Sequence, residues 1–268
     1  MGIFITEDYL REKYGLAHGS EVQLPEGCRL TPSAQALISE RKITIRFVNE
    51  QGEVFVASDD GKEINKVHPL KTNNQRPNNG CWACGSDIDD KPSFMTHLND
   101  QVLVPKNHPR IGLRGKIDTA ICVCVEAQCL LGDQPPFIVH ALSDIRSYLG
   151  QLLQAEVMDQ PLPLPSFGDI DSETIHKWSH SPLEYLGYDH MLPDAHFGLK
   201  VAKLNTLRAM IRELELEASK LFIDISMRLE REDIVAGLNR LSSAIYVVMI
   251  LVWQCQNGKE NVLERLVK

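Results

Sequence analysis

Three charged side chains recur at helical spacing in the second half of the chain. Arg208, Arg212 and Glu215 are four and three residues apart, so a helix would place them on one face. Two guanidinium groups on one face suit a polyphosphate, because their forked N–H groups match phosphate oxygens. The same spacing also fits an ordinary solvated Arg–Glu face. The pattern therefore predicts either an anion-binding edge or a charged surface.

A polar residue interrupts the apolar pattern of the last predicted helix. Asn239 lies between the apolar positions Leu238 and Leu241. Asparagine is a weak helix former because its side-chain amide competes for backbone partners. Its position indicates either a specific hydrogen-bond partner or a buried structural amide.

A cationic stretch precedes another predicted helix. Lys106 and Arg110 fall in a loop with the sequence VPKNHPR, and Asp118 is expected in the first turn of the helix that follows. The backbone N–H groups at a helix N-terminus favour phosphate, and nearby cations add to this preference. The preference of acidic residues for helix starts is the simpler explanation of Asp118. The chain contains neither a Walker A nor a G-x-G-x-x-G pattern, so a nucleotide site here would be unorthodox.

Two cysteines and two histidines are spaced like metal ligands. Cys81 and Cys84 form a C-x2-C pair, whose two sulfurs can reach one ion from a tight turn. Twelve residues separate Cys84 from His97, and twelve separate His68 from Cys81. Two thiolates and two imidazoles make a plausible tetrahedral set. The alternative is a pair of free cysteines in a loop with unrelated histidines nearby.

The composition limits the possible partners. The chain has 268 residues, 43% of them hydrophobic and 24% charged, with a formal net charge of −8. This acidic balance argues against a general nucleic-acid coat, which needs a basic surface. The longest apolar run, residues 244–253, is shorter than the roughly 20 residues that span a bilayer, so no membrane partner is expected. Seven cysteines without a visible secretory signal predict reduced thiols and a cytoplasmic location.

The elements that must position these residues are mainly helices. Residues 1–66 predict a small α/β region, with a helix that begins at Thr31-Pro32 and a strand over 43–48. Residues 67–100 are expected to form a Cys/His loop, and residues 101–268 a bundle of five helices. The longest helix is expected over about 197–229, and its buried stripe comprises Leu207, Ile211, Leu214, Ala218, Leu221 and Ile225.

Taken in order, these motifs resemble those of the cobalamin adenosyltransferase family, most closely its ethanolamine-utilisation type. VPKNHPRIGLRGKID (104–118) is similar to the family's K-x-x-x-R-x-x-x-x-G-x-x-D segment. RAMIRELE (208–215) is similar to its R-x-x-x-R-x-x-E helix, and LNRLSS (238–243) to its L-N-R-L-S helix. DDKPSFMTHL (89–98) is a blurred version of its triphosphate loop, and LTPSAQALISERKITI (30–45) resembles the ethanolamine-utilisation type in particular.

The resemblance implies a five-helix bundle that forms a homo-oligomer, with ATP near the subunit interfaces. The implied reaction transfers the 5′-deoxyadenosyl group of ATP to cob(I)alamin, with Mg²⁺ on the phosphates, and gives adenosylcobalamin and triphosphate. The nucleophile is the substrate itself, so the protein has to position the reactants and stabilise the leaving triphosphate. The resemblance assigns catalytic roles to Arg208, Arg212 and Asp118, the last as the partner that orients Arg208. It assigns ATP binding to Thr96, Lys106, Arg110, Arg208, Arg212, Glu215 and Asn239.

The chain departs from the family at the metal motif. The ethanolamine-utilisation type carries a histidine, eleven residues and then C-C-x-x-C, whereas Gly80 stands here at the first of these cysteines. The remaining candidate ligands for Fe²⁺ or Zn²⁺ are His68, Cys81, Cys84 and His97.

The side chain that closes the lower face of the corrin in the family would fall near His190 and Met191, which are the candidate cobalamin contacts. The resemblance also implies possible partners, a cobalamin reductase or components of a bacterial microcompartment. A different class of function stays open beside the enzyme: a non-catalytic helical adaptor, or a corrinoid carrier, with a structural zinc module.

Overall fold

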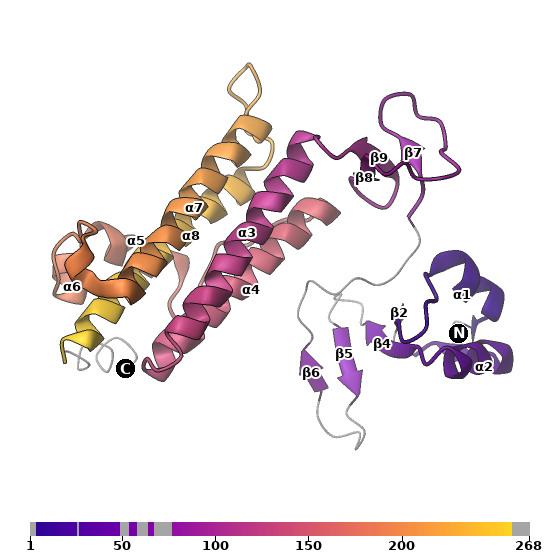
Figure 1. The fold of residues 1–268 in the computed structure, drawn as a ribbon, viewed down its shortest axis with the longest axis horizontal. Helices are drawn as coiled ribbons and strands as arrows, with labels where there is room; N and C mark the ends of the chain where they lie inside the picture. The colour runs from indigo at the N-terminus through magenta and orange to yellow at the C-terminus, as the bar shows by residue number, and fades with distance from the viewer. Residues whose placement is uncertain (1–3, 26, 49–53, 58–63, 67–76, 259–268) are drawn as a thin grey trace. The chain divides into compact units, whose positions relative to one another are not determined.

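The computed structural model describes residues 4–25, 27–48, 54–57, 64–66 and 77–258 (Figure 1). The chain divides into two compact units, Met1–Pro105 and Lys106–Lys268. The finer division into 1–66, 67–100 and 101–268 stays a prediction.

The first part of the N-terminal unit is the small α/β region expected from the sequence. Thr31 caps the second helix with its side-chain oxygen, which accepts from the backbone N–H of Ala34, and Pro32 is the first helical residue. A four-stranded sheet has the order β2-β4-β5-β6, in which β2 and β4 are parallel and the later pairs are antiparallel. These elements are β1 (Phe4–Ile5), α1 (Glu7–Lys13), β2 (Glu21–Pro25), β3 (Arg29–Leu30), α2 (Pro32–Glu40), β4 (Thr44–Val48), β5 (Val54–Ala57) and β6 (Ile64–Lys66).

Cys81 lies in a three-stranded sheet of the same unit, and Cys84 lies in the turn that follows its strand. The strands of this sheet are β7 (Gly80–Cys81), β8 (Met95–His97) and β9 (Val102–Pro105), in the order β7-β9-β8. The expected Cys/His loop therefore contains short strands. Thr96 pairs with Val104, and His97 pairs with Leu103.

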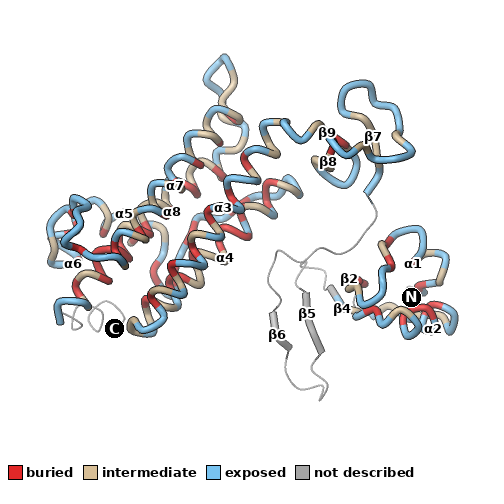
Figure 2. Tube along the Cα trace, viewed as in Figure 1, coloured by how far each residue is buried: buried red, intermediate tan, exposed pale blue. Residues whose placement is uncertain are grey.

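The C-terminal unit is the helical bundle expected from the sequence. Four long helices form it, α7 packs against α3 and α8, and the shorter α5 packs on α8. Buried side chains follow the inward faces of these helices (Figure 2). The elements are α3 (Pro109–Leu130), α4 (Pro136–Met158), α5 (Ser172–His180), α6 (Pro182–Leu186), the 3-10 turn η1 (Ala195–Phe197), α7 (Gly198–Phe222) and α8 (Glu232–Gln256).

Two helix ends differ from the prediction. The helix α3 begins at Pro109, because His108 caps it with Nδ1, which accepts from the N–H of Arg110 at 3.2 Å. Arg110 is therefore inside the helix, and Asp118 lies well beyond its first turn. The helix α7 ends at Phe222, so Ile225 is fully exposed and not part of the buried stripe.

The apolar helix α8 contributes more buried residues than any other described helix. By length and composition it could cross a membrane, but 61% of its most apolar stretch is buried inside the protein. The core helix of a globular protein meets the same criterion, and α8 packs against α4, α5 and α7.

Candidate functional site

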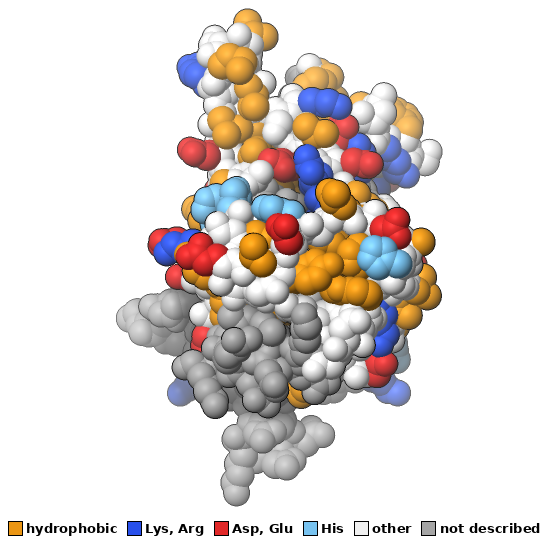
Figure 3. All heavy atoms as spheres, turned by 90° about the vertical axis from the view of Figure 1, so that its left-hand side faces the viewer, with side chains coloured by type: hydrophobic (Ala, Val, Ile, Leu, Met, Phe, Trp, Pro, Cys, Tyr) orange, Lys and Arg blue, Asp and Glu red, His pale blue; other side chains and the backbone are white. Residues whose placement is uncertain are grey.

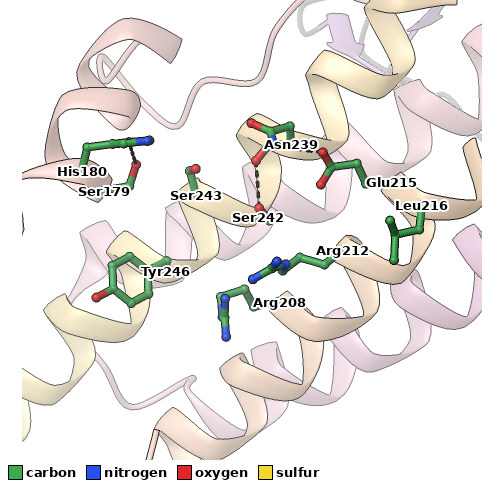
Figure 4. Close-up of a pocket in the computed structure, with 10 residues that line it drawn as sticks. All are labelled: Ser179, His180, Arg208, Arg212, Glu215, Leu216, Asn239, Ser242, Ser243 and Tyr246. Atoms are coloured by element: carbon green, nitrogen blue, oxygen red, sulfur yellow. Dashed lines mark hydrogen bonds between the residues drawn. The ribbon is translucent and has the colours of Figure 1, made fainter. Parts of the chain in front are cut away.

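An open cavity of about 460 Å³ lies between α5, α7 and α8 (Figure 4). Its wall is rich in groups that form hydrogen bonds and includes two positive charges. The lining residues are Ser179, His180, Arg208, Arg212, Glu215, Leu216, Asn239, Ser242, Ser243 and Tyr246. The predicted charged face of α7 and the predicted polar residue of α8 thus meet in one place.

The two arginines come from the edge of the buried stripe of α7. Leu207, Ile211 and Leu214 are buried, which turns Arg208 and Arg212 toward α8 and the cavity. Burial lowers the pKa of Arg208, and the neighbouring charge of Arg212 lowers it further. Asn205 holds the Arg208 guanidinium by accepting from its Nε and Nη2 at 3.1 and 3.0 Å. Two neighbouring positive charges, of which Arg208 is half-buried and Arg212 is exposed, favour an anion between them.

Glu215 and Asn239 form the polar side of the cavity opposite Tyr246. The Nδ2 of Asn239 donates to Oε1 of Glu215 at 2.9 Å, across from α8 to α7. Asn239 is exposed, so the alternative of a buried structural amide is wrong. The pair leaves further carboxylate and amide atoms free to bind a ligand with hydroxyl or amine groups.

The sequence interpretation missed several residues of this wall. Ser242, Ser243 and Tyr246 follow Asn239 at spacings of three, four and seven, so they share its face of α8. That periodicity was the available signal for them. His180 and Ser179 come from α5, and no pattern in the sequence links α5 to this place.

Comparison with known proteins identifies the family. Residues 4–72 match the family described as corrinoid adenosyltransferase EutT N-terminal domain, and residues 89–252 match cobalamin adenosyltransferase. The corrinoid adenosyltransferase EutT of Salmonella typhimurium strain LT2 is 41% identical over 94% of this chain and 92% of its own length. The chain belongs to the corrinoid adenosyltransferase family of the EutT type. The protein of the same name from Escherichia coli K12 is 40% identical over 92% of this chain and 91% of its own length.

For a corrinoid adenosyltransferase, the cavity contains part of the site that the resemblance assigns. Arg208, Arg212, Glu215 and Asn239 line it. Of the described residues, Lys106 and Asp118 are exposed elsewhere on the C-terminal unit and do not line it. Their roles stay predictions.

Arg110 has a different partner from the expected one. Its Nε and that of Arg114 each donate to one carboxylate oxygen of Glu156, which is completely buried on α4. The Nη2 of Arg110 also donates to the backbone oxygen of Glu156. These contacts tie the start of α3 to the end of α4, so ATP binding by Arg110 is not supported by its position.

The candidate cobalamin contacts lie in the segment between α6 and η1. Met191 is buried, with 4% of its surface exposed, whereas His190 is exposed. The next residue, Leu192, has 81% of its surface exposed. The large exposed apolar side chain of this segment is therefore Leu192, a residue that the sequence interpretation did not select.

The described residues do not assemble the predicted metal centre. Cys84 contacts Ser86 through its sulfur at 2.9 Å, and this hydrogen bond is the main cause of a lowered pKa of its thiol. His97 bonds instead through Nε2 to Oδ1 of Asn79, at 3.0 Å. Within the described ranges no three His, Cys, Asp or Glu side chains are grouped to hold a metal. His68 lies outside the described residues.

The backbone at Gly80 accounts for the missing cysteine. A Cβ atom there would lie 2.8 Å from the carbonyl oxygen of Gln101, closer than side chains tolerate. Gly80 belongs to β7, which pairs with β9. Its N–H donates to the same carbonyl oxygen of Gln101. A cysteine at this position would require the small sheet to shift.

Proposed function

We propose that the chain transfers the 5′-deoxyadenosyl group of MgATP to cob(I)alamin and releases triphosphate. The observation that carries this proposal is the cavity in which Arg208 and Arg212 face the Glu215–Asn239 pair. Together they offer cations for a polyphosphate and hydrogen-bonding atoms for a ribose within one wall. No serine or cysteine nucleophile is required, because the substrate supplies the nucleophile.

The reaction forms a cobalt–carbon bond and breaks the bond between C5′ and its phosphate oxygen. The electron pair of the broken bond leaves with triphosphate, whose charge therefore rises at that oxygen. Arg208 and Arg212 stabilise this charge, and Asn205 keeps the Arg208 guanidinium in place before the substrate binds. Glu215 and Asn239 hold the sugar so that C5′ faces the corrinoid.

We also infer that ATP brings its own Mg²⁺. Glu215 is the single carboxylate that lines the cavity among the described residues, so most ligands of the ion would be phosphate oxygens and water.

The site is completed, in this proposal, by a second copy of the chain. Of the described residues, Asn205 is the group to which the Arg208 guanidinium donates, and Asp118 is exposed on α3. An exposed carboxylate on one copy is available to an arginine on another. Lys106 and Thr96 would approach the triphosphate in the same way. We propose a cytoplasmic or microcompartment-associated homo-oligomer that receives cob(I)alamin from a reductase.

A metal at the Cys/His loop has less support than the ATP site. Two thiols, Cys81 and Cys84, are close in sequence, and we place no step of the reaction there. Metal analysis of the purified protein, and activity after chelation, decide whether an Fe²⁺ or Zn²⁺ ion is present and required. A metal content that persists in Cys81→Ser and Cys84→Ser variants would show that the pair does not bind it.

The test mixes the purified protein anaerobically with MgATP and chemically reduced cobalamin and follows the visible spectrum. We expect the spectrum of adenosylcobalamin and an equal amount of triphosphate. Arg208→Ala and Arg212→Ala should each raise KM for ATP about tenfold or more, the effect of losing a charged hydrogen-bond donor. Arg228→Ala, an exposed arginine paired with Asp224, is the matched control and should behave as wild type.

Other outcomes identify the alternatives. Absence of both conversion and ATP binding would favour a helical adaptor. Corrinoid binding without triphosphate release would favour a corrinoid carrier.

A further inference from the structure

Tyr246 connects the cavity to a neighbouring segment of the chain. Its ring lines the cavity from α8, and its hydroxyl points away from the side where Asn239 and Glu215 lie (Figure 4). That hydroxyl oxygen accepts the backbone N–H of Met191 at 2.7 Å. Burial raises the pKa of Tyr246, so the hydroxyl stays neutral at physiological pH and keeps this geometry.

The segment held by Tyr246 joins α6 to η1. Its middle residue, Met191, is fixed twice, by burial of the side chain and by the hydrogen bond of its N–H. The residues on either side, His190 and Leu192, are exposed. Because Met191 is buried between them, the histidine and the leucine both face solvent at the surface.

A second anchor fixes the far end of this segment to the same helix. Phe197 packs edge-on against Trp253 of α8, with ring centroids 4.8 Å apart. The ring centroid of His196 lies 4.0 Å from that of Phe197. Tyr246 and Trp253 are two turns apart on α8. The helix that carries Asn239 of the cavity thus also sets the position of the segment.

The surface around this end of the bundle is partly apolar. Figure 3 shows hydrophobic side chains gathered beside histidines on the face at which α5 and α6 lie. Leu183 and Tyr185 of α6 and Leu192 of the segment are among the exposed apolar residues. Such a surface next to a charged cavity suits a large, flat and mostly apolar ring system that must meet ATP.

We propose that Tyr246 is a positioning residue for the corrinoid: it holds residues 189–193 at the edge of the ATP cavity, so that Leu192 contacts the corrin ring. This inference rests on the proposed function. Tyr246 acts through the segment and takes no part in the chemistry of ATP.

The first test compares two variants that each lose one hydroxyl. Tyr246→Phe keeps the ring and removes the bond to Met191. Tyr148→Phe is the matched control, because its hydroxyl also binds backbone, the oxygen of Pro163 at 2.8 Å, but does not line this cavity. We expect Tyr246→Phe to raise KM for cob(I)alamin about fivefold, as for one lost hydrogen bond, with KM for ATP within about twofold of wild type.

Tyr148→Phe should lower the midpoint of unfolding about as much as Tyr246→Phe does, since each loses one hydrogen bond. It should change neither the KM for cob(I)alamin nor the KM for ATP. An unchanged KM for cob(I)alamin in Tyr246→Phe, or an equal rise for ATP, would overturn the inference. Loss of tryptophan fluorescence on addition of cob(II)alamin gives a binding readout that needs no turnover, because Trp253 lies at the second anchor. If wild type makes no adenosylcobalamin, the proposed function fails; if wild type reacts and Tyr246→Phe matches it, only this inference fails.

A double-mutant cycle tests the route of the effect. Leu192→Ala should also raise KM for cob(I)alamin, whereas Leu164→Ala, at another exposed leucine, should not. If Tyr246 acts through the segment, the double variant should raise KM for cob(I)alamin by less than the product of the two single effects of Tyr246→Phe and Leu192→Ala. Independent, fully multiplicative effects would contradict the proposed route.

Discussion

At the scale of single residues, helical spacing was enough to predict four residues that line the candidate site. Arg208, Arg212 and Glu215 share a face because of their separation, and Asn239 stood out as a polar residue among apolar ones. Arg110 could not be understood in this way, because its partner Glu156 is 46 residues away and on another helix. Patterns within one element predict which face a residue occupies, but not which distant side chain it meets.

The contact between Asn239 and Glu215 makes activity sensitive to charge at position 239. Asn239→Asp places two carboxylates within hydrogen-bond distance, so they repel and the pKa of one of them rises. We expect a higher KM for ATP at pH 8 and a return toward the wild-type value as the pH falls toward 5, where the pair takes up a proton. Initial rates across this range, compared with wild type, provide the measurement. A variant whose KM has the same pH dependence as wild type would contradict the contact.

At the scale of elements, the errors lie at helix ends. Pro109 and His108 start α3 earlier than the apolar pattern suggested, since that pattern begins only at Leu113. The end of α7 depends on a tight turn in which Asp224 accepts from the N–H groups of Ser226 and Arg228. Caps and turns are made by side-chain hydrogen bonds, which hydrophobic periodicity does not report.

The buried carboxylate between α3 and α4 should contribute strongly to stability. Glu156→Gln removes the charge that compensates Arg110 and Arg114, and breaking a buried pair in this way costs about 3 kcal/mol. Urea unfolding of the two proteins measures the difference. Glu173→Gln, which removes an exposed partner of Lys177, is the control and should leave the free energy of unfolding unchanged.

The cap of α3 should make stability depend on pH. Burial lowers the pKa of His108 below its usual value, and Arg110 and Arg114 lower it further. The unfolded chain therefore binds the proton more readily, so the stabilisation is present above about pH 6.5 and is lost as the pH falls through the folded pKa.

His108→Asn tests this dependence, because asparagine also caps helices but does not titrate in this range. The free energy of unfolding of wild type should fall more steeply than that of the variant between pH 7 and pH 5. Parallel curves would show that His108 does not carry the dependence.

At the scale of the whole molecule, the ordered set of motifs predicted the family and the helical bundle, and both are confirmed. The sequence could not show which residues another copy supplies, since no motif encodes the arrangement of subunits. Asp118 and Arg208 illustrate this: their types and spacing were apparent, whereas the proposed pairing between them requires a second copy of the chain.

Mixing two impaired variants tests a shared site. At low ATP concentration Asp118→Ala and Arg208→Ala should each react much more slowly than wild type, and mixed oligomers formed by co-expression should regain part of the lost rate, because some interfaces then contain both native residues. Size measurement by light scattering establishes the oligomer. A monomer with full activity, or mixtures as slow as their components, would exclude a site shared between copies.

The extensive burial of α8 has a consequence for the order of folding during synthesis. This helix contributes thirteen buried residues and packs against α4, α5 and α7, yet it follows all of them along the chain. While the ribosome makes the earlier helices, α3 can already pack against α4 and α7, but the apolar faces that α4, α5 and α7 turn toward α8 have no partner and remain open to water or to other chains. The bundle therefore closes only after residue 256 has left the exit tunnel, and nascent chains that stall before α8 should depend on chaperones to stay soluble.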